Sequence, residues 1–327
     1  MHVMVTGAAG MIGRKLAERL GQEGALAGAA ITVLTLSDIV APPVPAGFAG
    51  AVSRVTADLA AAGVAERLIS ARPEVVFHGA GVVSAEAEMD LEKGYHANLD
   101  GTRMLLEAVR EVGGGYRPKV VFTSSCAVFG APFPDVIPDD FHLTPLTSYG
   151  TQKAMCELML ADYSRRGFLD GVGLRLPAVC VRPGPPNKAA SGFFSAIIRE
   201  PLAGRDTVLP VSEDVLHTHA SPRATVGFLI HAAGLSRDVL GPRINITMPG
   251  VCCTVGEQIE ALRRVAGDAA VARIRRAPDP LVERIVAGWP HRFDAARARA
   301  LGFVAESSFD EIVRIHVEDD LGGRLPA

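Results

Sequence analysis

Two side chains near the middle of the sequence have the spacing of an acid/base pair. Tyr149 and Lys153 stand four residues apart in the segment YGTQKAMCELMLADY. On a helix this spacing puts both side chains on one face. A phenol is a poor base at neutral pH, but a neighbouring ammonium group favours the phenolate form. The pair is therefore suited to proton transfer.

A third candidate, Ser125, closes the strand-like run KVVFTSS. In a parallel sheet, a side chain at this position projects toward a ligand at the carboxyl edge. Its hydroxyl group can hold a reacting oxygen beside the tyrosine. Because a Tyr and Lys pair at this spacing is common by chance, the hypothesis rests on all three residues together. We predict Ser125, Tyr149 and Lys153 as the catalytic set, with Ser125 and Tyr149 also contacting the substrate.

A glycine-rich turn, TGAAGMIG, follows the first strand-like run and precedes a helical pattern. The spacing of Gly7, Gly10 and Gly13 allows a tight turn, a close approach of the backbone to a pyrophosphate, and close packing of the helix on the sheet. The phosphates would lie at the positive end of the helix, beside Met11 and Ile12. The turn predicts a dinucleotide cofactor.

Asp38 ends the next strand-like run, ITVLTLSD. A carboxylate at this place binds the adenosine ribose hydroxyls and repels a ribose 2′-phosphate. No Arg or Lys occurs between Asp38 and Arg54 to receive such a phosphate. The sequence therefore favours NAD over NADP.

The first half of the chain alternates short β-branched runs with helical stretches, which is the rhythm of βαβ units. This rhythm predicts an α/β fold, a doubly wound parallel sheet of the Rossmann type with helices on both faces. We expect an NAD-binding domain over residues 1–175, with a strand returning to it near 243–250. Residues 176–327 would form a smaller, mainly substrate-binding domain.

The second half is less regular than the first. A helix is expected from about Phe193, while the stretch from Asp206 to Arg223 reads as loop-rich. Thr254 and Glu257 stand three residues apart before an apolar run, the pattern of a capping box that opens a helix.

The composition excludes several classes of protein. The 327 residues carry 33 basic and 36 acidic side chains, and this near-neutral balance argues against a nucleic-acid partner. No apolar run approaches the roughly 20 residues of a membrane span. The first strand is expected at His2, leaving no signal peptide before it, so we expect a cytoplasmic protein. The five cysteines lack metal-ligand spacing, which predicts free thiols and no metal site.

The segments TGAAGMIG, SSCAVFG and YGTQK, in this order, resemble the short-chain dehydrogenase/reductase superfamily in its extended branch, the NAD-dependent epimerase/dehydratase family. The resemblance runs from residue 2 to about residue 305. It implies that Tyr149 is the acid/base, that Lys153 holds the nicotinamide ribose, and that Ser125 orients the substrate hydroxyl. The further cofactor contacts that we expect are Asp58, Leu59, Ala80, Gly81, Asn98 and Leu176. The alternative for Asn98 is an amide that packs the helix.

At some positions the sequence differs from the pattern of this branch, and these differences disfavour some of the family's reactions. Cys126 and Ala127 stand where the dehydratases carry an acid pair, which disfavours sugar dehydration. Nucleotide-sugar enzymes of the branch use an arginine and an asparagine around the diphosphate. Here the corresponding places hold the segment LHTHASPR, residues 216–223, and Ala178. A small substrate without a nucleotide is therefore favoured.

Residues 175–204 and 217–223 resemble one group within this branch, the D-erythronate dehydrogenases. This resemblance implies oxidation of the 2-hydroxyl of a small sugar acid by NAD, D-erythronate giving 2-dehydro-D-erythronate. A carboxylate substrate needs donors, and we expect them from Asn187, Ser191 and Arg223. Arg223 could equally form a structural ion pair. His217 and His219 are interpreted as ordinary polar loop residues.

Two other functions stay open at this point. One is a sugar epimerase that retains its NAD, and the other is a non-catalytic NAD-binding sensor. A homodimer is expected by likeness to the family, with the helix that carries Tyr149 in the interface. Its residues Ala154, Leu158 and Ala161 could equally belong to the core of one chain.

Overall fold

The computed structural model describes residues 1–184 and 191–325. By its contacts the chain divides into two compact units. Unit 1 comprises Met1–Val128, Thr147–Arg175 and Val226–Thr247, and unit 2 comprises Phe129–Leu146, Leu176–Thr225 and Met248–Ala327. Asn187, one of the expected substrate contacts, lies outside the described residues.

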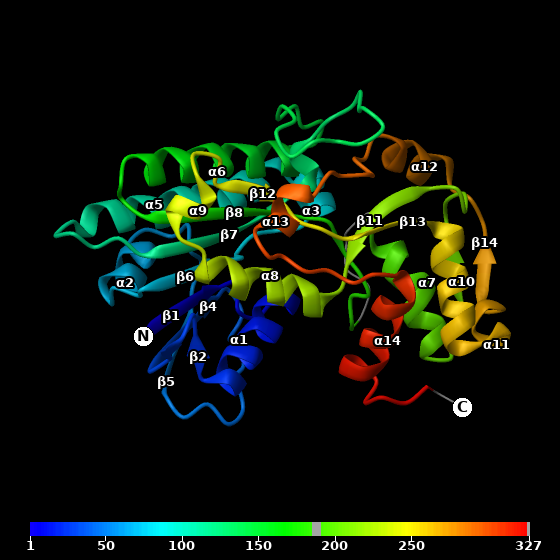
Figure 1. The fold of residues 1–327 in the computed structure, drawn as a ribbon, viewed down its shortest axis with the longest axis horizontal. Coiled ribbons are helices and arrows are strands. Elements are labelled where there is room, and N and C mark those ends of the chain that lie inside the picture. Colours follow the sequence, from blue (N-terminus) through cyan, green and yellow to red (C-terminus); the bar gives the residue numbers. More distant parts are fainter. Residues whose placement is uncertain (185–190, 326–327) are drawn as a thin grey trace. The chain divides into compact units, whose positions relative to one another are not determined.

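A seven-stranded parallel sheet forms the centre of unit 1 (Figure 1). Its strands, in spatial order, are β12 (Asn245–Thr247), β8 (Asp170–Leu176), β7 (Lys119–Ser125), β6 (Val75–His78), β1 (His2–Thr6), β4 (Val33–Asp38) and β5 (Ala51–Thr56). The chain order reverses at β1, which has β4 on one side and β6 on the other. Such a switch point is where doubly wound sheets bind their ligands. The predicted fold class is confirmed.

Helices cover both faces of this sheet, as Figure 1 shows for α1 on one face and for the neighbours α5 and α6 on the other. The helical segments of unit 1 are α1 (Met11–Glu23), α2 (Val64–Ser70), α3 (Ser84–Met89), α4 (Leu91–Gly94), the π-helical turn η1 (Tyr95–Asp100), α5 (Gly101–Val112), the 3₁₀ turn η2 (Cys126–Val128), α6 (Ser148–Arg165) and α9 (Arg237–Leu240). A short hairpin joins β2 (Ala25–Leu26) to β3 (Ala29–Ala30), and α8 (Pro222–Gly234) begins in unit 2 and continues in unit 1.

The inner strands of unit 1 are largely buried because both faces of the sheet are covered. Val3, Met4 and Val5 of β1 are buried, and so are Val75 to His78 of β6. Side chains from α2 and α5 join those of β6 and β7 in one continuous apolar core. The carboxyl ends of these strands are thereby held in fixed positions.

Unit 2 is built from smaller pieces around its own apolar core. A three-stranded sheet has the order β13 (Val251–Thr254), β11 (Leu216–Ala220) and β9 (Ala178–Val179), and a second pair joins β10 (Thr207–Leu209) to β14 (Ile274–Arg276). The helices are α7 (Gly192–Leu202), α10 (Val255–Ala266), α11 (Asp268–Val271), α12 (Pro280–Ala287), α13 (Ala296–Ala300) and α14 (Phe309–Asp320).

The stretch from Asp206 to Arg223 is only partly loop, because it also contains the strands β10 and β11. Each is at most five residues long and pairs with a strand far along the chain, β14 or β13. A period-2 pattern over so few residues gives little local signal. The strands exist because of pairing partners that only the folded chain supplies.

Within residues 1–184 and 191–325, no helix is both long enough and apolar enough to cross a membrane.

The capping box predicted from Thr254 and Glu257 is present at the start of α10. The Thr254 Oγ1 atom accepts a hydrogen bond of 3.1 Å from the Glu257 backbone N–H, and the Glu257 carboxylate accepts one of 2.7 Å from the Thr254 backbone N–H. We expect Thr254→Ala to lower the free energy of unfolding by about 1 kcal/mol, measured by urea denaturation. The control is Ser53→Ala on the edge strand β5. Equal losses in both variants would contradict the assignment.

Candidate active site

The Lys153 side chain is held at the carboxyl end of β7. Helix α6 begins with a side-chain cap, Thr147 Oγ1 accepting from the Gly150 backbone N–H at 3.0 Å. One turn later the buried Lys153 Nζ donates to the Thr123 carbonyl oxygen at 2.8 Å. This nitrogen also lies 4.7 Å from the centre of the Phe122 ring and 5.8 Å from that of the Tyr149 ring. The structure thus brings the predicted ammonium and phenol together.

Ser125 occupies the last position of β7, two residues after the carbonyl group that binds Lys153. Its Oγ atom accepts a hydrogen bond of 3.1 Å from the Ala127 backbone N–H in the turn η2. Both η2 and β7 contact α6. The hydroxyl group is half-buried, as is Tyr149, so both remain accessible to a ligand at this edge of the sheet.

A buried ion pair fixes the helix that carries the Tyr149 and Lys153 side chains. Glu157, one turn after Lys153, is completely buried, and its carboxylate accepts from Arg175 Nε at 3.0 Å and from Arg175 Nη2 at 2.8 Å. The Ser124 hydroxyl donates to the same carboxylate at 2.6 Å. This network joins α6 to both β7 and β8, so it sets the position of the helix over the strand that ends in Ser125. The sequence analysis missed it, although Glu157 follows Lys153 at helical spacing.

His78 lies beneath the site as a neutral group. Its Nδ1 atom is 2.8 Å from Thr6 Oγ1, and its Nε2 atom is 2.8 Å from Thr102 Oγ1. Burial, together with the positive charge of Lys153, lowers the pKa of His78 to about 3. The imidazole therefore stays uncharged and links β1 to the start of α5.

The glycine-rich turn has the geometry of a cradle for phosphates. Gly7 adopts a φ of +74°, and a Cβ atom there would lie 2.6 Å from the Gly79 backbone. A Cβ atom on Gly13 would lie 2.1 Å from the Gly7 carbonyl oxygen. Helix α1 starts at Met11, with Ile12 next, and among the described residues no side chain caps its N-terminus. Free backbone N–H groups at a helix start favour a phosphate group, so the turn fits NAD.

Asp38 is at the carboxyl end of β4, beside this turn. Its Oδ2 atom accepts a hydrogen bond of 2.9 Å from the Ala9 backbone N–H. The carboxylate therefore helps to hold the turn in place, and the residue is only half-buried, which leaves it open to ribose hydroxyls. Its proposed role in selecting NAD stays a prediction.

Asn98 lies in the π-helical turn η1, which leads directly into α5. The amide is buried, with Oδ1 accepting from the Val82 backbone N–H at 2.8 Å and Nδ2 donating to Gln152 Oε1 at 2.7 Å. A Cβ atom on Gly81 would come within 2.4 Å of the Asn98 oxygen. These contacts correspond to the packing role that was the alternative for Asn98. They hold Gly81, and with it Ala80, next to the glycine-rich turn.

The remaining expected cofactor contacts, Asp58, Leu59 and Leu176, differ in their burial and in their hydrogen bonds. Asp58 Oδ2 is 2.8 Å from His96 Nε2, and Oδ1 accepts from the Ala60 backbone N–H at 2.9 Å. Partial burial raises the pKa of Asp58, but these hydrogen bonds outweigh it and leave the pKa below its usual value. Leu59 is buried in the core of unit 1, and Leu176 is the half-buried last residue of β8. Their proposed cofactor roles stay predictions.

Two further expected substrate contacts, Ser191 and Arg223, lie in unit 2. Ser191 precedes α7, and its Oγ atom accepts a hydrogen bond of 3.1 Å from Arg182 Nη2. The Arg223 guanidinium forms ion pairs with Asp319 and, at 2.8 Å, with Glu318. For Arg223 the structure therefore shows the ion pair that the sequence had left as the alternative.

The interpretation of His217 and His219 as loop residues is wrong, because both lie in strand β11. This strand is the middle one of its sheet, so His219 is fully buried, and the His217 ring stacks on Phe194 with 5.2 Å between ring centres. Burial lowers the pKa of His217 to about 4, with a smaller contribution from His291. Both rings therefore pack as neutral groups.

The fold and the site together define the class of protein. Residues 3–218 match the model of the NAD dependent epimerase/dehydratase family, and the chain belongs to this family. The family resemblance seen in the sequence is confirmed, and so is NAD as the cofactor.

Two relatives match over nearly their whole length. The chain is 47% identical to the D-erythronate dehydrogenase of Cupriavidus necator, with 98% of each chain covered. It is 40% identical to the D-erythronate dehydrogenase of Haemophilus influenzae, with 98% of this chain and 100% of the relative covered. These similarities place the chain among the NAD-dependent oxidoreductases.

A similar solved structure is that of the nucleoside-diphosphate-sugar epimerase from Agrobacterium tumefaciens. It is 61% identical, has a TM-score of 0.97, and covers 100% of this chain and 96% of its own. The two kinds of name differ in the reaction that they imply, which leaves the choice between net oxidation and epimerisation to experiment.

The Glu157 network gives a test of what holds α6. We expect Glu157→Gln to lower the free energy of unfolding by about 3 kcal/mol, since it leaves the Arg175 charge buried without its partner. The matched control is Glu23→Gln, which removes the exposed pair of Glu23 with Arg19 and is expected to change stability by less than about 1 kcal/mol. Urea denaturation measures both. A loss at Glu157 no larger than that at Glu23 would show that the buried pair does not anchor the helix.

Proposed function

We propose that this protein is a sugar-acid dehydrogenase that oxidises the 2-hydroxyl group of D-erythronate to 2-dehydro-D-erythronate with NAD. The observation that carries the proposal is the full-length similarity to two enzymes named D-erythronate dehydrogenase. The arrangement of Lys153, Tyr149 and Ser125 at one sheet edge supports it, because oxidation of an alcohol needs a base at the hydroxyl group.

In the proposed reaction the Tyr149 phenolate accepts the proton of the substrate hydroxyl group. Lys153 keeps the phenolate competent, because its ammonium group is fixed near the Tyr149 ring by the Thr123 carbonyl. Ser125 Oγ holds the substrate oxygen. NAD bound on the glycine-rich turn supplies the acceptor for the hydride from C2. Residues Gly7 to Gly13 would hold its pyrophosphate, and Asp38 its adenosine ribose.

The proposal gives Arg223 a structural role, because Glu318 and Asp319 already neutralise its charge. Ser191 stays a proposed substrate contact.

The fixed position of helix α6 is important for this chemistry, since a proton transfers efficiently only over hydrogen-bond distance.

The second candidate function is a sugar epimerase that retains its NAD and returns the hydride to the same substrate. The observation in its favour is the 61% identity to the chain named as a nucleoside-diphosphate-sugar epimerase. Against it stands Ala178 at the place where nucleotide-sugar enzymes carry an asparagine.

Absorbance at the NADH band distinguishes the two candidates. Purified protein is mixed with NAD or NADP and with D-erythronate, L-threonate or D-threonate. We expect NADH from D-erythronate and little reaction with NADP, because Asp38 repels a 2′-phosphate. No NADH from any of the acids, with NAD found already bound to the purified protein, would contradict the dehydrogenase and favour the epimerase.

A substitution tests the role of Tyr149. We expect Tyr149→Phe to reduce turnover at least about 100-fold, because the proton acceptor is lost, while NAD binding changes little. Steady-state kinetics and NAD titration measure the two effects. Tyr163→Phe, near the other end of α6, is the control and should keep its activity. If Tyr149→Phe reacts as fast as the parent protein, the proposed acid/base is wrong.

A further inference from the structure

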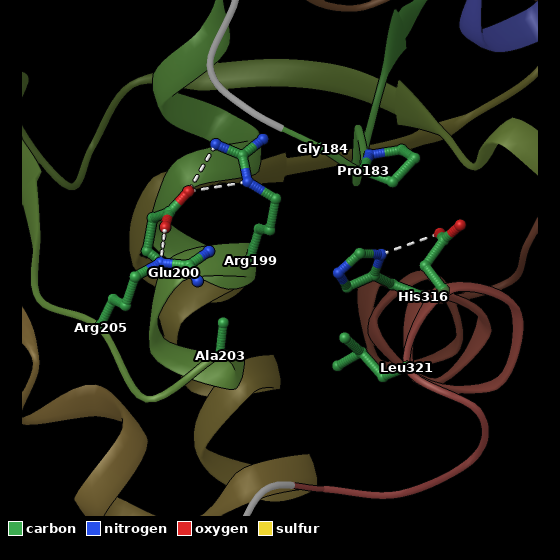
Figure 2. A pocket seen from close by; sticks show the side chains of 9 residues that line it. Pro183, Gly184, Arg199, Glu200, Ala203, Arg205, His316 and Leu321 are labelled. Atoms are coloured by element: carbon green, nitrogen blue, oxygen red, sulfur yellow. Dashed lines mark hydrogen bonds and ion pairs between the residues drawn. The ribbon is translucent and has the colours of Figure 1, made fainter.

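Unit 2 contains a pocket that none of the expected catalytic residues lines. Its volume is about 510 Å³, within the range of sites for small metabolites. Figure 2 shows that the end of α7 and the turn up to Arg205 form one wall, and the C-terminal part of α14 forms the other. Pro183 and Gly184 complete the lining.

Two arginines in the first wall share a single carboxylate. Arg199 is buried, its Nε donating to Glu200 Oε1 at 2.8 Å and its Nη1 to the Arg182 carbonyl oxygen at 2.8 Å. Arg205 Nε donates to the other Glu200 oxygen at 2.6 Å. Partial burial raises the pKa of Glu200, but the hydrogen bonds from the two arginines outweigh it and lower the pKa below its usual value. Within this wall two positive charges face one negative charge, and the Asp320 carboxylate of the opposite wall balances the formal charge of the lining.

One donor of this group has no hydrogen bond. Arg199 Nη2 is buried and lies 2.7 Å from Glu200 Oε1, an ion-pair distance, but it makes no hydrogen bond within the part of the chain that the structure describes. Arg205 is more than half exposed, and its Nε atom is the one bound to Glu200. The wall therefore offers cationic donors to an incoming anion.

The opposite wall presents a histidine, His316, with one ring nitrogen that makes no hydrogen bond among the described residues. The His316 side chain is only 3% exposed, and its Nδ1 atom donates to Asp320 Oδ2 at 3.0 Å. Its Nε2 atom is buried and has no partner among the described residues. Figure 2 shows this edge of the ring turned into the pocket, toward the side of Arg199. With Nδ1 donating to Asp320, Nε2 is left to form a hydrogen bond with a polar group of a ligand.

Orphaned buried polar atoms are rare in folded proteins, and each calls for a partner. Here His316 Nε2 is such an atom, and it lines the same pocket as the Arg199 and Arg205 guanidinium groups. We propose that this pocket is a binding site for a small hydroxylated anion. A carboxylate or phosphate group would bind Arg199 and Arg205, and a hydroxyl group would form a hydrogen bond with His316.

The acidic groups of the pocket are compatible with an anion. Glu200 is held by the two arginines, and Asp320 accepts from His316. Ser125, Tyr149 and Lys153 are all absent from the lining, so a ligand here would not contact the residues proposed to react with the substrate. The inference does not depend on the reaction proposed above.

Calorimetric titration of the full chain tests the site with three probes: D-gluconate, D-glucose 6-phosphate and neutral D-glucose. We expect one site per chain for one or both anions and none for D-glucose. Binding of D-gluconate alone identifies a carboxylate site, and binding of D-glucose 6-phosphate alone a phosphate site. Binding of D-glucose as tight as that of the anions, or no saturable binding of either anion, overturns the proposal.

Variants place the binding in the pocket. Arg205→Met removes an exposed side chain, so the fold is retained, and we expect about ten-fold weaker binding, the loss of one charge-assisted hydrogen bond. His316→Phe keeps an aromatic ring at this position but removes its nitrogen atoms. We expect it to weaken the binding of anions that carry hydroxyl groups. The matched control is Arg273→Met, an exposed arginine paired with Asp206 and absent from the lining, which should bind like the parent. Equal affinity in Arg205→Met and Arg273→Met would show that the anions bind elsewhere, including at the site around Tyr149.

Discussion

The buried contact between Glu157 and Arg175 is the constraint on which the site in unit 1 depends. A buried carboxylate is costly unless it is paired, and here Arg175 and Ser124 satisfy it completely. The three residues come from α6, β8 and β7, so the helix cannot slide along the strands without breaking several charge-assisted hydrogen bonds at once. Lys153 and Tyr149 take their positions from this anchor, because they lie one and two turns before it on the same face of α6.

A second constraint comes from close backbone approach around the first turn. Gly7 and Gly13 leave no room for a Cβ atom, and Asp38 fastens the turn through the Ala9 N–H. The same carboxylate thus orders the loop and faces the place expected for the ribose. Rigid support of the turn and the proposed recognition of the ribose would then use one side chain, which would reduce the ordering that binding requires.

The glycine turn, Asp38 and the Tyr149 helix could be predicted from the sequence because each depends on local spacing. Glu157 was missed because an acidic residue in a helix is ordinarily solvated, and only the fold brings Arg175 beside it. His217 and His219 were misjudged for a similar reason: polar letters in a short segment suggest a loop, whereas two partner strands make it the centre of a sheet. The same limit applies to Arg223, whose partners lie almost a hundred residues away. Long-range pairing is what the local pattern does not contain.

The path of the chain through unit 1 has a consequence for its synthesis. The sheet receives its last strand, β12, only after the chain has passed through much of unit 2. While a ribosome produces that intervening stretch, β8 remains an open edge with unpaired backbone groups. At translation rates of roughly 5–20 residues per second, this interval lasts several seconds. During that time the unpaired backbone groups of β8 are accessible to a chaperone or to a neighbouring nascent chain.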